Sequence, residues 1–240
     1  MTEAGARTAE LEKGLAAVRS RIGAATKASG RANEPTLIVV TKFHPAEDVR
    51  RLAGLGVTDV GENRDQEASA KADALHELGL HWHFVGQLQS KKAKSVVRYA
   101  YAVHSVDRPQ LADGLARAVA AEQDRSGRAA LECFIQVSLD DDAGAHRGGA
   151  APADVPSLAE QLAAADGLVL AGVMAVAPLG VPPEASFEKL AGISARLTTD
   201  HPAATGISAG MSQDLEVAIR YGATHLRIGS DILGSRPAVG

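Results

Sequence analysis

Eight short apolar runs alternate with helix-like segments along most of this 240-residue chain, and this alternation restricts the fold more than any other feature. The runs have the length and composition of buried strands and lie at 36–41, 57–61, 82–86, 101–106, 131–137, 168–174, 205–209 and 225–229. Helical periodicity covers 46–55, 64–78, 89–99, 109–126, 154–165, 184–200 and 212–221, with a last short helix near 230. Strands that are separated by helices pair in parallel through right-handed crossovers. The sequence therefore predicts an α/β protein with a parallel sheet.

The number of units favours a closed barrel over an open sheet. Eight strand–helix units in about 250 residues are typical of a (β/α)8 TIM barrel. The competing interpretation is a doubly wound open sheet, but the first strand leads into VTKFHP at 40–45, which lacks a glycine-rich phosphate fingerprint. A further helix over 8–28 precedes the first strand, with Leu11, Leu15, Val18 and Ile22 at helical spacing. We expect one domain over 1–240, with a leading helix and linker at 1–34 and the barrel at 35–240.

Charge and composition exclude several classes of protein. The net charge of −4 and the pI of about 6.1 do not suit a general nucleic-acid binder. No run approaches the roughly 18 apolar residues of a membrane helix, and the N-terminus lacks the apolar core of a signal peptide. The single cysteine, Cys133, excludes an intramolecular disulfide and a cysteine-rich zinc site. We expect a cytoplasmic monomer that binds neither nucleic acid nor a membrane.

Lys42 is the candidate functional residue that its position in the sequence supports most specifically. The two-residue period of a strand places Ile38, Val40 and Lys42 on one face. If this face points into the barrel, Lys42 reaches the mouth, where the carboxyl ends of barrel strands carry function. Desolvation there lowers the pKa of a lysine and favours the neutral amine that attacks an aldehyde. The competing interpretation is a strand-end lysine whose amine extends into solvent.

A second signal lies after the seventh and eighth strands. Ser212 precedes an amphipathic helix and is expected as its N-cap, while Gly229 and Ser230 lie between a strand and a short helix. The loops after strands 7 and 8 often bind phosphate in barrels, although ordinary capping explains these residues equally well. Arg227 lies within the last strand and needs an acceptor, for which Glu62 is one candidate.

Two further features, a group of histidines and an irregular stretch, do not indicate a specific chemistry. His81, His83 and His104 do not form a recognisable zinc-ligand spacing, so no metal site is expected, and His83 is expected to be buried and hydrogen-bonded. The irregular stretch 140–156 is either a loop over the barrel mouth or a surface excursion.

Taken together, the motifs of the chain resemble those of the YggS/PROSC family of pyridoxal 5′-phosphate (PLP) homeostasis proteins. The resemblance spans essentially the whole chain and rests on VVTKFHP (39–45), VGENRDQE (60–67), HWHFVGQLQSKK (81–92), HSVD (104–107), GVMAV (172–176), SAGMSQDLEVAIRYG (208–222) and LRIGSDILGSR (226–236). It implies a barrel like the N-terminal domain of fold-type III alanine racemase, with PLP as its cofactor.

The resemblance also implies roles for individual residues. Lys42 matches the lysine that holds PLP as an internal aldimine, and Arg227 the arginine that faces the pyridine nitrogen. Asn63 matches an asparagine near the cofactor ring. Ser212, Gly229 and Ser230 match the phosphate site, and His83 and Met174 match positions that line the pocket.

Two classes of function remain open. In the first, the protein binds and delivers PLP, with PLP-dependent apoenzymes as possible partners and without robust catalysis. In the second, it is a PLP-dependent racemase or a Schiff-base aldolase. A racemase needs acid/base groups on both faces of its substrate, and neither Tyr101 nor Tyr221 is expected at the mouth. Because the barrel and leading helix account for nearly all of the length, we expect no second domain to complete a racemase site, and the carrier is favoured.

Overall fold

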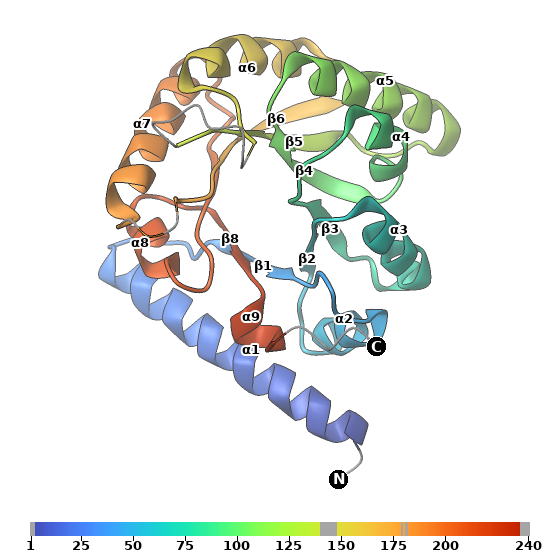
Figure 1. The fold of residues 1–240 in the computed structure, drawn as a ribbon, viewed down its shortest axis with the longest axis vertical. Coiled ribbons are helices and arrows are strands. Elements are labelled where there is room, and N and C mark those ends of the chain that lie inside the picture. The colour runs from blue at the N-terminus through green and yellow to red at the C-terminus, as the bar shows by residue number, and fades with distance from the viewer. Residues whose placement is uncertain (1–2, 140–147, 179, 181, 236–240) are drawn as a thin grey trace.

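The computed structural model describes residues 3–139, 148–178, 180 and 182–235, and in it eight strands form one closed barrel inside a ring of helices (Figure 1). The strands are β1 (Thr36–Val40), β2 (Asp59–Glu62), β3 (His81–Phe84), β4 (Ala100–Val106), β5 (Leu131–Gln136), β6 (Leu168–Met174), β7 (Gly206–Ser208) and β8 (His225–Ile228). The helices are α1 (Glu3–Ala28), α2 (Ala46–Gly54), α3 (Asp65–Ala74), α4 (Ala93–Val96), α5 (Pro109–Ser126), α6 (Val155–Ala164), α7 (Glu184–Asp200), α8 (Leu215–Arg220) and α9 (Ser230–Leu233), with short 3-10 turns at His76–Leu78, Ser90–Lys92 and Pro152–Asp154.

Each strand pairs in parallel with the next, and β8 closes on β1, where Ile38 lies opposite Arg227. The predicted (β/α)8 barrel is therefore confirmed, and the open sheet was wrong. Because all eight strands run the same way, their carboxyl ends form one rim and their amino ends the other. Residues that follow the strands thus meet at one end of the barrel.

Two predicted helices are shorter than expected. The helix expected over 89–99 divides into a 3-10 turn at Ser90–Lys92 and the single turn α4. The helix expected over 212–221 begins only at Leu215. Asp214 occupies the N-cap position, but its side chain makes no capping hydrogen bond. It accepts instead from the Met211 N–H at 2.6 Å, which closes a turn ahead of the helix. The prediction of Ser212 as N-cap was therefore wrong.

The apolar residues form two separate clusters. The larger one lies between the strands and the surrounding helices and contains most buried Leu, Val and Ile side chains. A small one, made of Ala102, Phe134 and Met174, lies inside the barrel. Polar side chains take much of the remaining interior, since His83, His104 and Arg227 are each at most 5% exposed. Such buried polar groups need internal partners.

The leading helix α1 packs across the outside of the barrel beside α8 and α9 (Figure 1). Its predicted apolar stripe is buried, with Leu11, Leu15, Val18 and Ile22 at most 2% exposed. Arg7, Gly14 and Arg21 follow each other at intervals of seven residues and so share a second face. This face contacts α9: Arg7 donates to Leu233 O at 3.0 Å, and Arg21 to Asp231 at 2.7 Å.

Of the irregular stretch 140–156, residues 140–147 lie outside the described part of the chain. The described part resumes at Gly148: Ala150 forms a bridge with Val137, and α6 begins at Val155. None of the helices in the described ranges is both long and apolar enough to cross a membrane.

Candidate functional site

A pocket of about 510 Å³ opens at the carboxyl ends of the strands. Six of the eight predicted site residues line it: Lys42, Asn63, Ser212, Arg227, Gly229 and Ser230. They come from the ends of β1, β2, β7 and β8, segments far apart in the sequence. The closure of β8 on β1 brings the lysine and the arginine into one pocket.

Lys42 is half-buried and stands beside a strained turn. Its neighbour Phe43 has a φ of 69° and is the one non-glycine residue with a positive φ in the described ranges. Such a conformation costs on the order of 1–3 kcal/mol. Two contacts hold it: the Phe43 N–H donates to Glu67 Oε1 at 2.6 Å, and the Arg64 guanidinium lies 5.1 Å from the centre of the Phe43 ring. The turn therefore directs the chain away from β1 directly after Lys42.

A buried network of charged residues, made of Lys71, Glu62 and Glu67, also holds this turn in place. Lys71 Nζ lies 2.6 Å from both Glu62 Oε1 and Glu67 Oε1, and donates to Thr41 O at 2.9 Å. The Thr41 hydroxyl also donates to Glu62 Oε1 at 2.6 Å. Burial raises the pKa of Glu62 although Lys71 opposes it. Sequence reasoning missed Lys71; its only signal was the four-residue spacing from Glu67 on one helix face.

Asn63 follows β2 and presents a polar atom without a partner. Its Oδ1 is buried and makes no hydrogen bond with any residue that the structure describes. Gly86, which follows β3, lies so close that a Cβ on it would come within 2.3 Å of Asn63 O. Any larger residue at position 86 would displace Asn63. An unpaired buried amide oxygen is costly, which indicates that Asn63 is placed for a ligand.

Arg227 is 5% exposed, and burial lowers the pKa of its guanidinium to about 10. It donates to the Ser208 hydroxyl at 2.7 Å and to Ala175 O at 2.9 Å, both neutral acceptors. The suggestion of Glu62 as its partner was wrong, because Glu62 is bound by Lys71 and Thr41 on the other side of β1. The guanidinium thus keeps its positive charge available at the pocket.

Two hydroxyls face each other on the other side of the pocket. Ser212 Oγ and Ser230 Oγ are 3.3 Å apart. Arg21 of α1 secures both loops from outside, because it donates to Ser212 O at 2.9 Å and pairs with Glu216 and Asp231 at 2.7 Å each. Sequence reasoning did not single out Arg21 for this purpose. The hydroxyl pair and the adjacent Gly229 backbone suit an anionic group.

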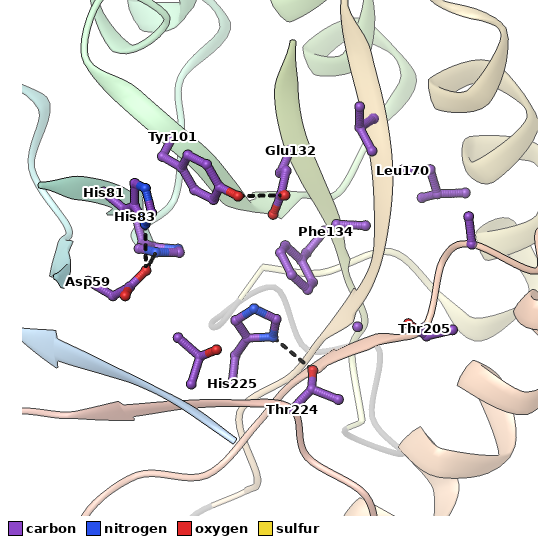
Figure 2. A pocket seen from close by; sticks show the side chains of 15 residues that line it. Asp59, His81, His83, Tyr101, Glu132, Phe134, Leu170, Thr205, Thr224 and His225 are labelled. Carbon is purple, nitrogen blue, oxygen red and sulfur yellow. Dashed lines mark hydrogen bonds and ion pairs between the residues drawn. The ribbon is translucent and has the colours of Figure 1, made fainter. Parts of the chain in front are cut away.

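The other two predicted site residues do not line this pocket. Met174 belongs to the apolar cluster inside the barrel. His83 is buried and hydrogen-bonded, as expected of a structural histidine, but it lines a different cavity of about 480 Å³ at the amino ends of the strands (Figure 2). Its position in β3 places it too deep in the barrel to reach the Lys42 pocket. His44, by contrast, lines the Lys42 pocket, and burial lowers its pKa.

The chemistry of the pocket is that of an anion site beside an amine. An amine, a buried cation, an unpaired amide oxygen and two hydroxyls converge on one volume. Within the described ranges, no group of three or more His, Cys, Asp or Glu side chains is placed to hold a metal ion. A small, phosphorylated organic molecule with an electrophilic carbon would find a partner for each of its parts.

Comparison with known proteins agrees with this geometry. The chain matches the family described as alanine racemase, N-terminal domain, over residues 14–237. The alanine racemase of Streptomyces coelicolor has the same fold, with a TM-score of 0.73 at 18% identity over 94% of this chain and 58% of that one. The fold and the placement of the pocket thus define a barrel of the alanine racemase type.

Closer relatives specify the family. A protein of Mycobacterium tuberculosis named pyridoxal phosphate homeostasis protein is 43% identical over 247 residues, which cover 96% of this chain and 94% of the relative. PipY of Synechococcus elongatus, whose structure was determined with PLP bound, is 33% identical with a TM-score of 0.79 over 93% of this chain and 100% of PipY. The chain belongs to the family of pyridoxal phosphate homeostasis proteins.

Proposed function

We propose that this protein binds PLP in the Lys42 pocket and acts in PLP homeostasis. The observation that carries the proposal is the convergence of half-buried Lys42, buried Arg227 and the unpaired Asn63 Oδ1 on one pocket. The structure of the PipY relative with PLP bound supports it. When bound, PLP supplies an aldehyde that condenses with a lysine amine with loss of water.

Each residue of the pocket would bind a different part of the cofactor. Lys42 is the attachment point, and the strained turn at Phe43 and the Lys71 network hold the end of β1 that carries it. Ser212, Ser230 and the Gly229 backbone would hold the phosphate, and Asn63 would donate or accept at the ring substituents. Arg227 would face the pyridine nitrogen. A fixed cation there disfavours protonation of that nitrogen and so weakens the electron sink on which PLP catalysis depends.

We further propose that the protein is a carrier and not an enzyme. The relatives that support this are named as homeostasis proteins. The placement of the tyrosines supports it too: Tyr101 lies in the cavity at the opposite end of the barrel, and the Tyr99 hydroxyl is directed to Asp65. Neither lines the Lys42 pocket, whereas a racemase needs acid/base groups on both faces of its substrate. The alternatives are a PLP-dependent racemase and a Schiff-base aldolase, and both would turn over amino acids.

Borohydride reduction of the PLP-loaded protein tests the site. We expect a pyridoxyl mass on the peptide that carries Lys42, and none in Lys42→Ala. Lys92→Ala is the matched control, because Lys92 is 40% exposed, pairs with the largely buried Asp65 and does not line the Lys42 pocket. Labelling of another lysine in the wild-type protein would refute the assignment. Racemisation and aldol cleavage of amino acids at high protein concentration test the carrier role, and turnover above about 1 per second would overturn it.

The remaining expectations stay predictions. They are a single PLP-binding domain over 1–240, a monomeric state, transfer of PLP to apoenzymes, and a cytoplasmic location. Sedimentation measures the oligomeric state, and activation of a PLP-free enzyme by the loaded protein measures transfer.

A further inference from the structure

A polar cavity at the amino ends of the strands has no part in the proposed function. It has a volume of about 480 Å³, and Figure 2 shows Asp59, His81 and His83 close together on one wall. Tyr101 stacks on His81 at 4.3 Å between the ring centres, and Glu132 lies at the far end of the Tyr101 side chain. The Tyr101 hydroxyl donates to Glu132 at 2.9 Å, while His83 Nε2 lies 2.9 Å from Asp59 Oδ1. The cavity therefore contains two carboxylates, each with its own partner.

A continuous chain of hydrogen bonds leads from one of these carboxylates to the Lys42 pocket. His83 Nε2 is 2.9 Å from Asp59 Oδ1, and His83 Nδ1 is 2.9 Å from His104 Nε2. His104 Nδ1 is in turn 2.8 Å from Ser208 Oγ, which accepts from Arg227 at 2.7 Å. His83, His104 and Ser208 are each at most 1% exposed. The chain thus crosses the barrel interior away from solvent.

The donors and acceptors of this chain can be assigned from Asp59 onward, with one proton on each imidazole. An ionised Asp59 carboxylate only accepts, so His83 donates from Nε2 and its Nδ1 accepts from His104 Nε2. His104 Nδ1 then accepts from the Ser208 hydroxyl, whose oxygen in turn accepts from Arg227. Every group is satisfied with both imidazoles neutral, and the chain runs in one direction from a cation to an anion.

The electrostatics favour the same assignment. Burial keeps the His104 ring neutral by lowering its pKa well below the usual value. Although burial opposes it, hydrogen bonds from His83 and Thr58 lower the pKa of Asp59 to about 2, so its carboxylate is ionised at neutral pH. An ionised carboxylate can only accept. Asp59 therefore fixes the His83 tautomer, and each later tautomer follows from the one before.

We propose that Asp59 is a positioning residue for Arg227 and acts on it through His83, His104 and Ser208 across the length of the barrel. Without the charge of Asp59, the two imidazoles are free to take the opposite tautomers. His104 Nδ1–H then donates to Ser208, which displaces the serine hydrogen and weakens the hold of Ser208 on the guanidinium. The inference rests on the proposed function in one respect: Arg227 matters to PLP because it faces the pyridine nitrogen.

The first test needs neither a variant nor a cofactor. Nitrogen-15 NMR of the ligand-free protein reports which imidazole nitrogen carries the proton. We expect the Nε2–H tautomer for both His83 and His104. An Nδ1–H tautomer at either ring would overturn the proposal. Because this measurement does not involve PLP, its outcome is independent of whether the proposed function is correct.

The second test measures the effect at Arg227. PLP is compared with 1-deaza-PLP, in which a CH group replaces the ring nitrogen, so that the affinity ratio isolates the contact with Arg227. We expect Asp59→Asn to lower this ratio about fivefold, equivalent to roughly 1 kcal/mol. Glu132→Gln is the matched control, because Glu132 lines the same cavity but binds only Tyr101 among the partners described, and it should change the ratio less than twofold.

An Asp59→Asn ratio equal to that of Glu132→Gln would overturn the proposal. A general loss of stability would lower the affinities for PLP and 1-deaza-PLP equally and leave their ratio unchanged. An unchanged ratio in Asp59→Asn would therefore indicate a purely structural role for Asp59. If the wild-type protein binds neither compound, the proposed function fails, while the NMR result still decides the direction of the chain. If Asp59→Asn does not fold, the wild-type tautomers decide alone.

Discussion

Gly14→Ala tests whether the leading helix sets the position of α9. A Cβ at Gly14 would lie 2.8 Å from Ile232 O and 2.9 Å from Asp231 O. Both contacts are with backbone, so α1 and α9 must separate. Overpacking of this kind costs about 1–3 kcal/mol, while alanine gains about 0.8–1 kcal/mol in helix propensity over glycine. The net loss of unfolding free energy is therefore about 0–2 kcal/mol.

Gly23→Ala is the matched control, because it makes the same exchange in the same helix. Its Cβ would meet only Glu34 Oε1, at 3.1 Å, which is the far end of a flexible side chain. Both variants gain the same helix propensity, so their difference isolates the contact with α9. We expect Gly14→Ala to be less stable than Gly23→Ala by about 1–3 kcal/mol in urea unfolding followed by circular dichroism.

The same pair of variants connects packing to function. α9 begins at Ser230, in the proposed phosphate site, so its displacement should weaken binding of PLP more than binding of pyridoxal, which lacks the phosphate. Equal stabilities for Gly14→Ala and Gly23→Ala, within about 0.5 kcal/mol, would refute the reasoning. That result would mean that α9 moves aside without cost and that α1 does not position it.

Three further predictions follow from buried or bridging charges. Lys71→Ala should lower the unfolding free energy by about 3–5 kcal/mol, because it leaves the Glu62 carboxylate buried without its cation; a loss below 1 kcal/mol in urea unfolding would contradict this. Burial lowers the pKa of His225 to about 4 from 6.5, so the unfolded chain takes up the proton first, and stability should fall as pH drops from 6.5 to 4. His225→Gln should lose less stability over this range, and an identical pH profile would count against the burial argument. Arg21→Ala should cost at most about 1 kcal/mol of stability, since its ion pairs are partly exposed, yet weaken PLP more than pyridoxal by releasing Ser212; equal weakening of both ligands would exclude this role.

Strand periodicity was sufficient to predict the fold and the rim that carries the pocket. Lys42 and Arg227 could be selected because each ends or interrupts an apolar run at a strand position, and a polar side chain there needs a reason. Ser212, Gly229 and Ser230 could be selected by their place between a strand and a helix after the last two strands, although ordinary capping explained them equally well. Asn63 has no such signal of its own, and its role is implied only by the family motifs.

The depth of a residue inside the barrel was not predictable in the same way. His83 pairs laterally with Gly61, and Gly61 with Val40, which lines the Lys42 pocket. His83 nevertheless lies in the cavity at the other end. Strands in a closed barrel tilt against its axis, so each lateral step also changes height. Alternation along one strand shows which face a side chain takes, but its height depends on the stagger of all the strands.

Contacts across the barrel cannot be predicted from the sequence for a related reason. His104 and Ser208 are separated by 104 positions, and only closure of the sheet brings them to 2.8 Å. The same holds for Lys71, whose partners on β2 and at the end of β1 are set by how α3 lies against the strands. Each of these residues reads as an ordinary polar residue in its own segment. Their functions depend on their partners in other segments of the chain, and these partners are known only once the fold is known.

The choice of neutral partners for Arg227 is consistent with a cation that must act on a ligand. A carboxylate beside it would repay the desolvation of the guanidinium but would also cancel its field at the pocket. Ser208 and Ala175 O satisfy the donors without adding negative charge. The carboxylate whose charge acts on the guanidinium is that of Asp214, and Asp59, at the other end of the barrel, is connected to Arg227 only through the His83 and His104 imidazoles. A polar barrel interior is therefore what this arrangement requires, because an apolar one would leave the buried guanidinium without acceptors.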